Sequence, residues 1–181
     1  MLDSLLRRQL DGPLTAVAAW LGARKVRALA LTLSAFLCRA VAMLDIGHRN
    51  YLLGLGLLAV AGAFDLLDGP LARCEGAAPL GAYLDHVLSL IAAAGIAFAF
   101  ALAEPDRALA AMFLMLGLVA RTAALTGAPT AGLLVGKTEL FLAFAVACVF
   151  PAWFSIVAYL VGIACFVAAG SRVAAIVAER P

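Results

Sequence analysis

Three aspartates stand in or beside segments that are otherwise strongly apolar. Asp65 and Asp68 belong to the stretch DLLDGPLAR (65–73), and Asp85 belongs to GAYLDHVLS (81–89). Asp65 and Asp68 are three residues apart and so share one helix face, while Asp85 begins the antiparallel neighbour after a short loop. Unpaired carboxylates are costly in a bilayer, and three at one depth repel one another unless a cation lies among them. The spacing therefore predicts a metal site, whose oxygen ligands favour Mg²⁺ or Mn²⁺.

The residues beside these carboxylates indicate what such a site would act on. Gly69 directly follows Asp68, and a glycine there lets a ligand approach the backbone closely. Arg73 ends the same segment, where its guanidinium can take phosphate oxygens. Carboxylates, a divalent metal, a glycine and an arginine together favour phosphoryl transfer at a membrane surface.

The composition indicates what kind of element positions these residues. Of the 181 residues, 66% are hydrophobic and 13% are charged, and the mean hydropathy is +1.08. Soluble domains are about half apolar and about a quarter charged, so we expect lipid as the solvent. At about 20 residues per crossing, the chain predicts an all-α integral membrane protein with six transmembrane helices. They are expected at 27–46, 51–73, 80–103, 107–126, 136–150 and 152–177.

The N-terminal segment 1–24 is expected to lie in the membrane interface, ahead of a single six-helix domain over 25–181. Its leucines at 2, 5, 6 and 10 fall at helical spacing beside Arg7 and Arg8, which is typical of an interfacial amphipathic helix. A second short piece, from Leu14 to Gly22, carries Trp20, a common interface anchor. The four cysteines show no paired spacing and predict neither a disulfide framework nor a zinc site.

The distribution of cations orients the helices by the positive-inside rule. If the N-terminus is cytoplasmic, the outside keeps only Arg49 and Arg107, and Arg39 remains within the first helix. We therefore expect both termini, and the three aspartates, on the cytoplasmic side of a bacterial-type inner or plasma membrane. The inside positions are then Arg7, Arg8, Arg24, Lys25, Arg27, Arg73, Arg121, Lys137, Arg172 and Arg180.

The motif resembles the signature of the class I CDP-alcohol phosphatidyltransferases, DxxDGxxAR followed by GxxxDxxxD. Here Asp65-x-x-Asp68-Gly69-x-x-Ala72-Arg73 is followed, after a spacer one residue shorter than the family's, by Gly81-x-x-x-Asp85. The resemblance implies transfer of a phosphatidyl (phospho-alcohol) group from a CDP-linked donor, such as CDP-diacylglycerol, to a hydroxyl acceptor, with release of CMP. It also implies that Asp65, Asp68 and Asp85 bind one or two divalent metals. Gly69, Ala72, Arg73 and Gly81 would contact the donor.

The sequence departs from the family signature at its last position, where Ser89 replaces the aspartate that is proposed as general base. Ser89 is four residues after Asp85 and so faces the same site, but a hydroxyl is a poor base. His86 is a candidate replacement, because an imidazole titrates in the right range; it can equally be an interfacial residue beside lipid headgroups. One interpretation is an active enzyme with a different base or one metal. The other is a catalytically degenerate scaffold that binds nucleotide or lipid.

Other readings follow from single features. A cation- or proton-coupled transporter also uses intramembrane carboxylates, but it would not require Gly69, Ala72 and Arg73 beside them. The stretch AGLLVGKT (131–138) loosely matches a phosphate-binding loop. Such a loop follows a strand in an α/β unit, whereas a loop rich in Pro and Gly precedes this stretch and an apolar helix follows it. Lys137 is therefore read as an interface cation paired with Glu139 or a headgroup. Arg39 either contacts a carboxylate of another helix or snorkels. Arg121 either binds an acceptor phosphate or marks topology.

The expected partners are the bilayer, the CDP-linked lipid donor and a small alcohol or polyol-phosphate acceptor, and no nucleic acid is expected. The resemblance also points to a homodimer. Runs of small residues such as Ala92, Ala93, Ala94 and Gly95 are expected to allow close helix packing.

Overall fold

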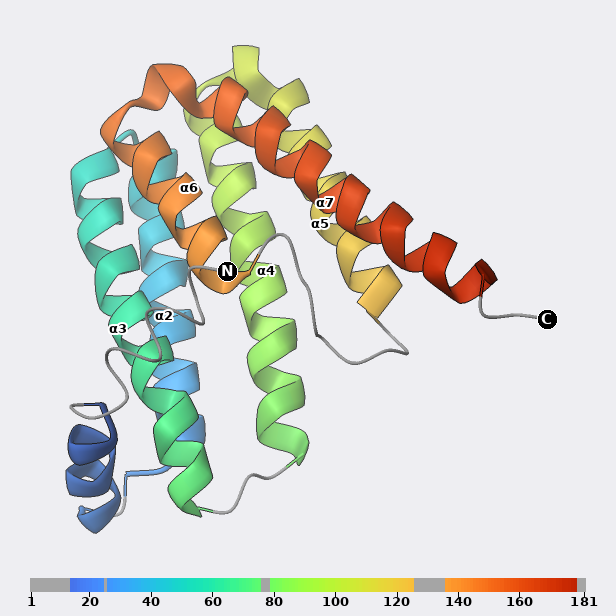
Figure 1. Cartoon of the computed structure of the whole chain (residues 1–181). Helices are drawn as coiled ribbons and strands as arrows, with labels where there is room; N and C mark the ends of the chain where they lie inside the picture. The colour runs from blue at the N-terminus through green and yellow to red at the C-terminus, as the bar shows by residue number, and fades with distance from the viewer. Residues whose placement is uncertain (1–13, 25, 76–78, 126–135, 179–181) are drawn as a thin grey trace.

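The computed structural model describes residues 14–24, 26–75, 79–125 and 136–178, and the regular structure within these ranges is helical (Figure 1). A short helix over Leu14–Ala23 comes first. It is followed by α2 (Ala28–Gly47), α3 (Tyr51–Glu75), α4 (Pro79–Ala103), the single turn η1 (Pro105–Arg107), α5 (Ala108–Leu125), α6 (Lys137–Val149), the single turn η2 (Pro151–Trp153) and α7 (Phe154–Ala178). The ends of the six expected helices agree with α2–α7 to within two residues.

The helix ends follow the local sequence. After Gly47 the chain turns through Arg49, whose φ of 66° lies in the left-handed region, and the Asn50 N–H donates to the Asp45 carbonyl at 2.8 Å. Pro105 and Pro151 each open a 3₁₀ turn, where the missing N–H of proline removes no helical hydrogen bond. These turns reverse the chain, so that consecutive helices run antiparallel (Figure 1).

Four helical stretches are long and apolar enough to cross a membrane within the described residues. They are Ala28–Gly47, Tyr51–Arg73, Tyr83–Ala103 and Pro151–Ala175. Leucines face outward along them, for example Leu37, which is 63% exposed, and Leu52, which is 77% exposed. Such outward apolar faces need lipid around them, so the chain is an integral membrane protein with at least part of the expected bundle. The expected count of six spans remains a prediction.

The helices pack in two groups. In Figure 1, α2, α3 and α4 run side by side with α6 against them, and α5 and α7 form a pair that diverges from the bundle at the C-terminal end of α7. Three of the largest fully buried side chains, Phe100, Phe154 and Ile46, lie at the end of the bundle away from the aspartates. There Phe100 of α4 stacks on Phe154 of α7 with ring centroids 4.4 Å apart and on Tyr51 of α3 at 5.7 Å. This aromatic core fixes the positions of α3 and α4, which carry the candidate site.

Small residues bring helices close together, as membrane interfaces require. Ala92 and Ala93 are 1% and 8% exposed, and a Cβ at Gly95 would lie 2.6 Å from the Met43 sulfur of α2. This confirms the close packing expected around residues 92–95. At the crossing of α5 and α7 the two backbones approach each other, because a Cβ at Gly117 would lie 2.9 Å from the Gly162 carbonyl oxygen.

The short helix Leu14–Ala23 lies where the second interfacial piece was expected. Ala18 is buried against Leu31 and Leu71, while Trp20 is 53% exposed. The Arg24 guanidinium carbon lies 3.8 Å from the centroid of the Trp20 ring, a cation–π contact. The amphipathic helix expected at residues 2–10 falls outside the described residues.

Candidate active site

The three aspartates meet at one end of the bundle. Asp65 and Asp68 lie in the C-terminal part of α3, and Asp85 lies near the start of α4. One carboxylate oxygen of each lies within 4.8 Å of the others, and all three side chains are partly buried. Carboxylates this close repel one another strongly unless positive charge compensates them. The cluster that the motif spacing predicted is therefore present, and nearby cations must compensate its negative charge.

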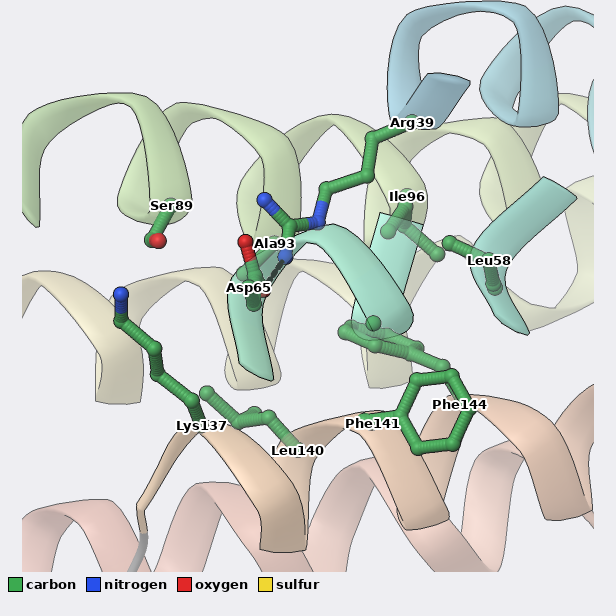
Figure 2. Close-up of a pocket in the computed structure, with 11 residues that line it drawn as sticks. Arg39, Leu58, Asp65, Ser89, Ala93, Ile96, Lys137, Leu140, Phe141 and Phe144 are labelled. Atoms are coloured by element: carbon green, nitrogen blue, oxygen red, sulfur yellow. Dashed lines mark hydrogen bonds and ion pairs between the residues drawn. The ribbon is translucent and has the colours of Figure 1, made fainter. Parts of the chain in front are cut away.

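Arg39 of α2 forms an ion pair with Asp65, and each side chain is 15% exposed (Figure 2). This contact resolves the alternative for Arg39, which reaches a carboxylate of another helix instead of snorkelling to the interface. Arg39 uses Asp65 Oδ2, while Asp65 Oδ1 is buried with no hydrogen-bond partner among the described residues. A buried carboxylate oxygen without a donor is costly, and a bound cation would satisfy it.

Thr32 of α2 contacts the second aspartate. Its Oγ1 lies 3.2 Å from Asp68 Oδ2 and also 3.2 Å from the Ala28 carbonyl oxygen. Thr32 is 7% exposed, a buried hydroxyl in an otherwise apolar helix. Its single hydroxyl proton is shared between these two acceptors, and when it is donated to the carboxylate it orients Asp68, as residues next to metal ligands commonly do.

Lys137, the first residue of α6, contacts Asp85. Its Nζ lies 2.6 Å from Asp85 Oδ1 and is also bonded to Oδ2. The described ion-pair partner of Lys137 is therefore Asp85, and not Glu139 as expected from the sequence. Glu139 instead accepts a hydrogen bond from the Gly136 N–H at 2.9 Å, which caps the start of α6. That cap holds the first turn of α6 so that Lys137 points at the aspartates.

A cavity of about 70 Å³ lies between α3, α4 and α6 beside the cluster (Figure 2). Its polar side is formed by Arg39, Asp65, Ser89 and Lys137, and Figure 2 shows the Lys137 and Ser89 side chains directed to the same space. Ser89 Oγ is buried without a hydrogen-bond partner among the described residues. The remaining lining is apolar apart from Gly62, and consists of Leu58, Ala93, Ile96, Leu140, Phe141 and Phe144. Ser89 thus faces the site, as its spacing from Asp85 predicted.

The other predicted site residues surround the cluster less tightly. His86 is exposed and is not among the residues that line the cavity. Gly69 and Ala72 are partly buried in the last turns of α3, and Arg73 is exposed at its end. A Cβ at Gly81, in the first turn of α4, would meet no atom of the described residues within 4 Å. Packing therefore does not require a glycine at position 81, and the space over its backbone is open to a ligand.

The cluster fits a divalent cation. It offers three oxygen ligands that converge from two helices, together with the unsatisfied Asp65 Oδ1. Oxygen ligands are those that Mg²⁺ and Mn²⁺ prefer. Asp65, Asp68 and Asp85 are the residues that would hold such an ion.

Sequence reasoning missed two residues of the site and left a third open. Lys137 is 52 residues from Asp85 and Thr32 is 36 residues from Asp68, so no local spacing links either pair. The available signals were weak: Thr32 is a hydroxyl residue within the apolar stretch ALALTL, and Lys137 follows a glycine at the start of a helix.

Comparisons with known proteins bear on the family and the fold of this chain. A family model described as CDP-alcohol phosphatidyltransferase matches residues 25–170. The fold is similar to the crystal structure of Mycobacterium tuberculosis phosphatidylinositol phosphate synthase (PgsA1) with CDP-DAG bound, with a TM-score of 0.72 and 18% identity, covering 88% of this chain and 91% of that chain. Among curated proteins, no sequence match was found. Because the family model spans most of the sequence, the chain belongs to the CDP-alcohol phosphatidyltransferase family, a class of transferases of phospholipid synthesis.

Proposed function

We propose that this chain transfers a phosphatidyl group from CDP-diacylglycerol, or a similar CDP-linked lipid, to the hydroxyl of a small alcohol or polyol phosphate. The observation that carries the proposal is the convergence of Asp65, Asp68 and Asp85, with oxygens within 4.8 Å, in a member of this family. The bound CDP-DAG of the structurally similar synthase supports the choice of donor.

The reaction that this site would perform is a displacement at phosphorus. The acceptor oxygen attacks the phosphorus of the phosphatidyl group, the bond from that phosphorus to the CMP oxygen breaks, and CMP leaves with the electron pair. The acceptor proton passes to a base. When bound, Mg²⁺ or Mn²⁺ would neutralise the diphosphate and orient it for attack. The chain's own part is to hold the three carboxylates in place through Arg39, Thr32 and Lys137.

The donor would lie along the end of α3 and the start of α4. Gly81, where an added Cβ would meet no described atom within 4 Å, supports close approach of the nucleotide to the backbone. Arg73 is exposed at the end of α3, and a guanidinium is a preferred partner of phosphate oxygens. Gly69 and Ala72 complete this donor side, because their small side chains leave room beside Asp68.

The acceptor hydroxyl would lie beside Ser89. Ser89 Oγ faces the cavity and can hydrogen-bond the acceptor, although a neutral hydroxyl is a poor base. In this proposal His86 stays the candidate base; because it is exposed and does not line the cavity, the acceptor proton would reach it through water rather than directly. Arg121 of α5 has a buried Nε without a hydrogen-bond partner among the described residues, which supports a role in binding an acceptor phosphate.

The site would face the cytoplasm. Among the described arginines and lysines, only Arg49 and Arg107 lie at the opposite end of the helices, and Arg39 lies between the ends. The remainder lie at the end that holds the aspartates: Arg24, Arg27, Arg73, Arg121, Lys137 and Arg172. This asymmetry supports cytoplasmic termini in a bacterial-type inner membrane.

The proposal also includes six crossings and a homodimer. The 18 residues of α5 would extend about 27 Å at about 1.5 Å per residue, close to the thickness of the hydrocarbon core. The 13 residues of α6 would extend only about 20 Å, which is less than the thickness of the hydrocarbon core. The polar first turn of α6 would therefore lie within the membrane, at the depth of the aspartates.

The proposal is tested by incubating the purified protein with CDP-diacylglycerol, Mn²⁺ and a panel of acceptors comprising inositol phosphate, glycerol phosphate and serine. We expect CMP and one new phospholipid to appear together. Loss of a residue that only orients a metal ligand typically costs about 10–100-fold. Asp68→Asn removes a proposed ligand itself and should reduce the rate of CMP release by more than this. Asp106→Asn, an exposed aspartate at the opposite end, is the control and should keep the activity. Equal rates for Asp68→Asn and the wild type would contradict the proposed site.

A further inference from the structure

Lys137 lies directly beside the three aspartates of the candidate metal site. Its ammonium group bonds to both oxygens of Asp85, and it lines the same cavity as Ser89. Asp85 and Ser89 are four residues apart on α4, so Lys137 reaches the place where the family signature has two carboxylates and this chain has one. A positive side chain therefore stands where one negative side chain is missing.

This contact contributes little to stability. The side chains of Lys137 and Asp85 are 41% and 27% exposed, and ion pairs with this much solvent contribute up to about 1 kcal/mol. The backbone at Lys137 is nevertheless held in place, because Glu139 caps the first turn of α6 through the Gly136 N–H. The main effect of Lys137 is therefore electrostatic: its ammonium group places a positive charge at Asp85.

The ligands at Asp85 separate a site with one divalent ion from a site with two. The charge balance alone does not: the three carboxylates, Arg39, Lys137 and the doubly charged diphosphate leave a net charge of −1 with one ion and +1 with two. At Asp85, however, both carboxylate oxygens already accept from Lys137 Nζ, and Ser89 stands where a further carboxylate would be. A second ion at this place would have to displace the ammonium group and would lack one carboxylate ligand.

We propose that Lys137 takes the place of a second metal ion at Asp85, so that the site works with a single divalent ion held chiefly by Asp65 and Asp68. This inference rests on the proposed phosphatidyltransferase function. In it, Ser89 and Lys137 form one adaptation: loss of the fourth carboxylate removes a ligand of the second ion, and the ammonium group supplies the positive charge. The Lys137 ammonium, at the start of α6, would then supply positive charge to the donor diphosphate.

The number of bound ions tests this inference without reference to activity. Free Mn²⁺ is titrated by its electron paramagnetic resonance signal in the presence of the purified full-length chain in lipid nanodiscs. We expect one Mn²⁺ per wild-type chain and two per chain of the double variant Lys137→Met/Ser89→Asp, in which the fourth carboxylate returns and the ammonium is absent. Lys25→Met, which removes the other lysine of the sequence, is the matched control and should bind one.

The activity of the same proteins gives an independent readout. Lys137→Met alone should lose about 10²–10³-fold in the rate of CMP release, as expected when a group that stabilises developing charge is removed. Adding Ser89→Asp to Lys137→Met should restore CMP release, with a rate that now rises with the square of Mn²⁺ concentration at low Mn²⁺. A lysine that only supported the fold would not be rescued in this way.

Each outcome is decisive. Two Mn²⁺ per wild-type chain would overturn the inference while leaving the phosphatidyltransferase site intact, and that result needs no variant to fold. One ion per chain in both the wild type and the double variant, with no rescue of CMP release, would also overturn it. Absence of Mn²⁺ binding in every protein would instead refute the metal site of the proposed function, and the inference with it.

Discussion

Arg39 and Asp65 face each other between α2 and α3, each with only 15% of its side chain exposed. Breaking a buried ion pair by removing one partner leaves an uncompensated charge in a poorly solvated place. The same carboxylate is a candidate metal ligand, so two different cations can compensate it. This makes the stability of the protein depend on metal in a way that a single substitution can expose.

We predict that Arg39→Met lowers the free energy of unfolding by about 3 kcal/mol without metal. With saturating Mn²⁺ the loss should be clearly smaller, because the bound ion compensates the negative charge of Asp65 in place of Arg39. Thermal unfolding in detergent, with and without Mn²⁺, measures both values. An equal loss under the two conditions would mean that Asp65 binds no ion.

Thr32 contacts Asp68 from α2, at 3.2 Å between Oγ1 and Oδ2. Thr32→Val keeps the shape of the side chain and removes the donor. Since residues that orient metal ligands typically contribute about 10–100-fold in metal affinity, the Mn²⁺ concentration for half-maximal CMP release should rise by that factor, with little change in the maximal rate. Thr122→Val is a matched control, because the Thr122 hydroxyl bonds to carbonyl oxygens of its own helix. An unchanged Mn²⁺ requirement in Thr32→Val would remove Thr32 from the site.

At the scale of elements, the contact of α5 with α7 depends on two glycines. A Cβ at Gly117 would lie 2.9 Å from the Gly162 carbonyl oxygen and 3.1 Å from its Cα, so relief requires movement of the α7 backbone. By contrast, a Cβ at Gly56 in α3 would meet no atom of the described residues within 4 Å. The two positions offer the same substitution with and without a clash.

Gly117→Ala should therefore destabilise the protein by about 1–3 kcal/mol through overpacking, whereas Gly56→Ala should be neutral or stabilising by up to about 1 kcal/mol. Thermal unfolding of the two variants in the same detergent compares them. If Gly117→Ala unfolds at the wild-type temperature, α5 and α7 are not packed at this crossing.

At the scale of the whole molecule, the orientation of the helices can be tested by reporters. We predict that green fluorescent protein fused after residue 181 is fluorescent in a bacterial host, and that alkaline phosphatase fused there is inactive, because the cation asymmetry retains this end in the cytoplasm. Alkaline phosphatase fused after Asp106, in η1 between α4 and α5, should be active. Reversed activities would move the site to the outer face.

Much of this molecule could be predicted from the sequence because its signals are local. Glycine, proline and charged residues separate apolar runs, so the ends of α2–α7 were placed to within two residues. The spacing of Asp65, Asp68 and Asp85 predicted a cluster that is present. Lys137 was misassigned because its partner is 52 residues away, and only the packing of α6 against α3 and α4 brings the pair together. The partner of Arg39 was left open for the same reason.

The most direct test of the central claim, that three aspartates suffice for phosphatidyl transfer, is the initial rate of CMP release from CDP-diacylglycerol by the wild type and by Ser89→Asp, side by side with Mn²⁺ and the acceptor panel. Restoring a missing general base typically gains about 10²–10⁴ in rate. We predict that the wild type is active and that Ser89→Asp falls well short of such a gain, because Lys137 and one metal ion already complete the site. A silent wild type beside an active Ser89→Asp would contradict the account and identify the chain as a scaffold that has lost its base.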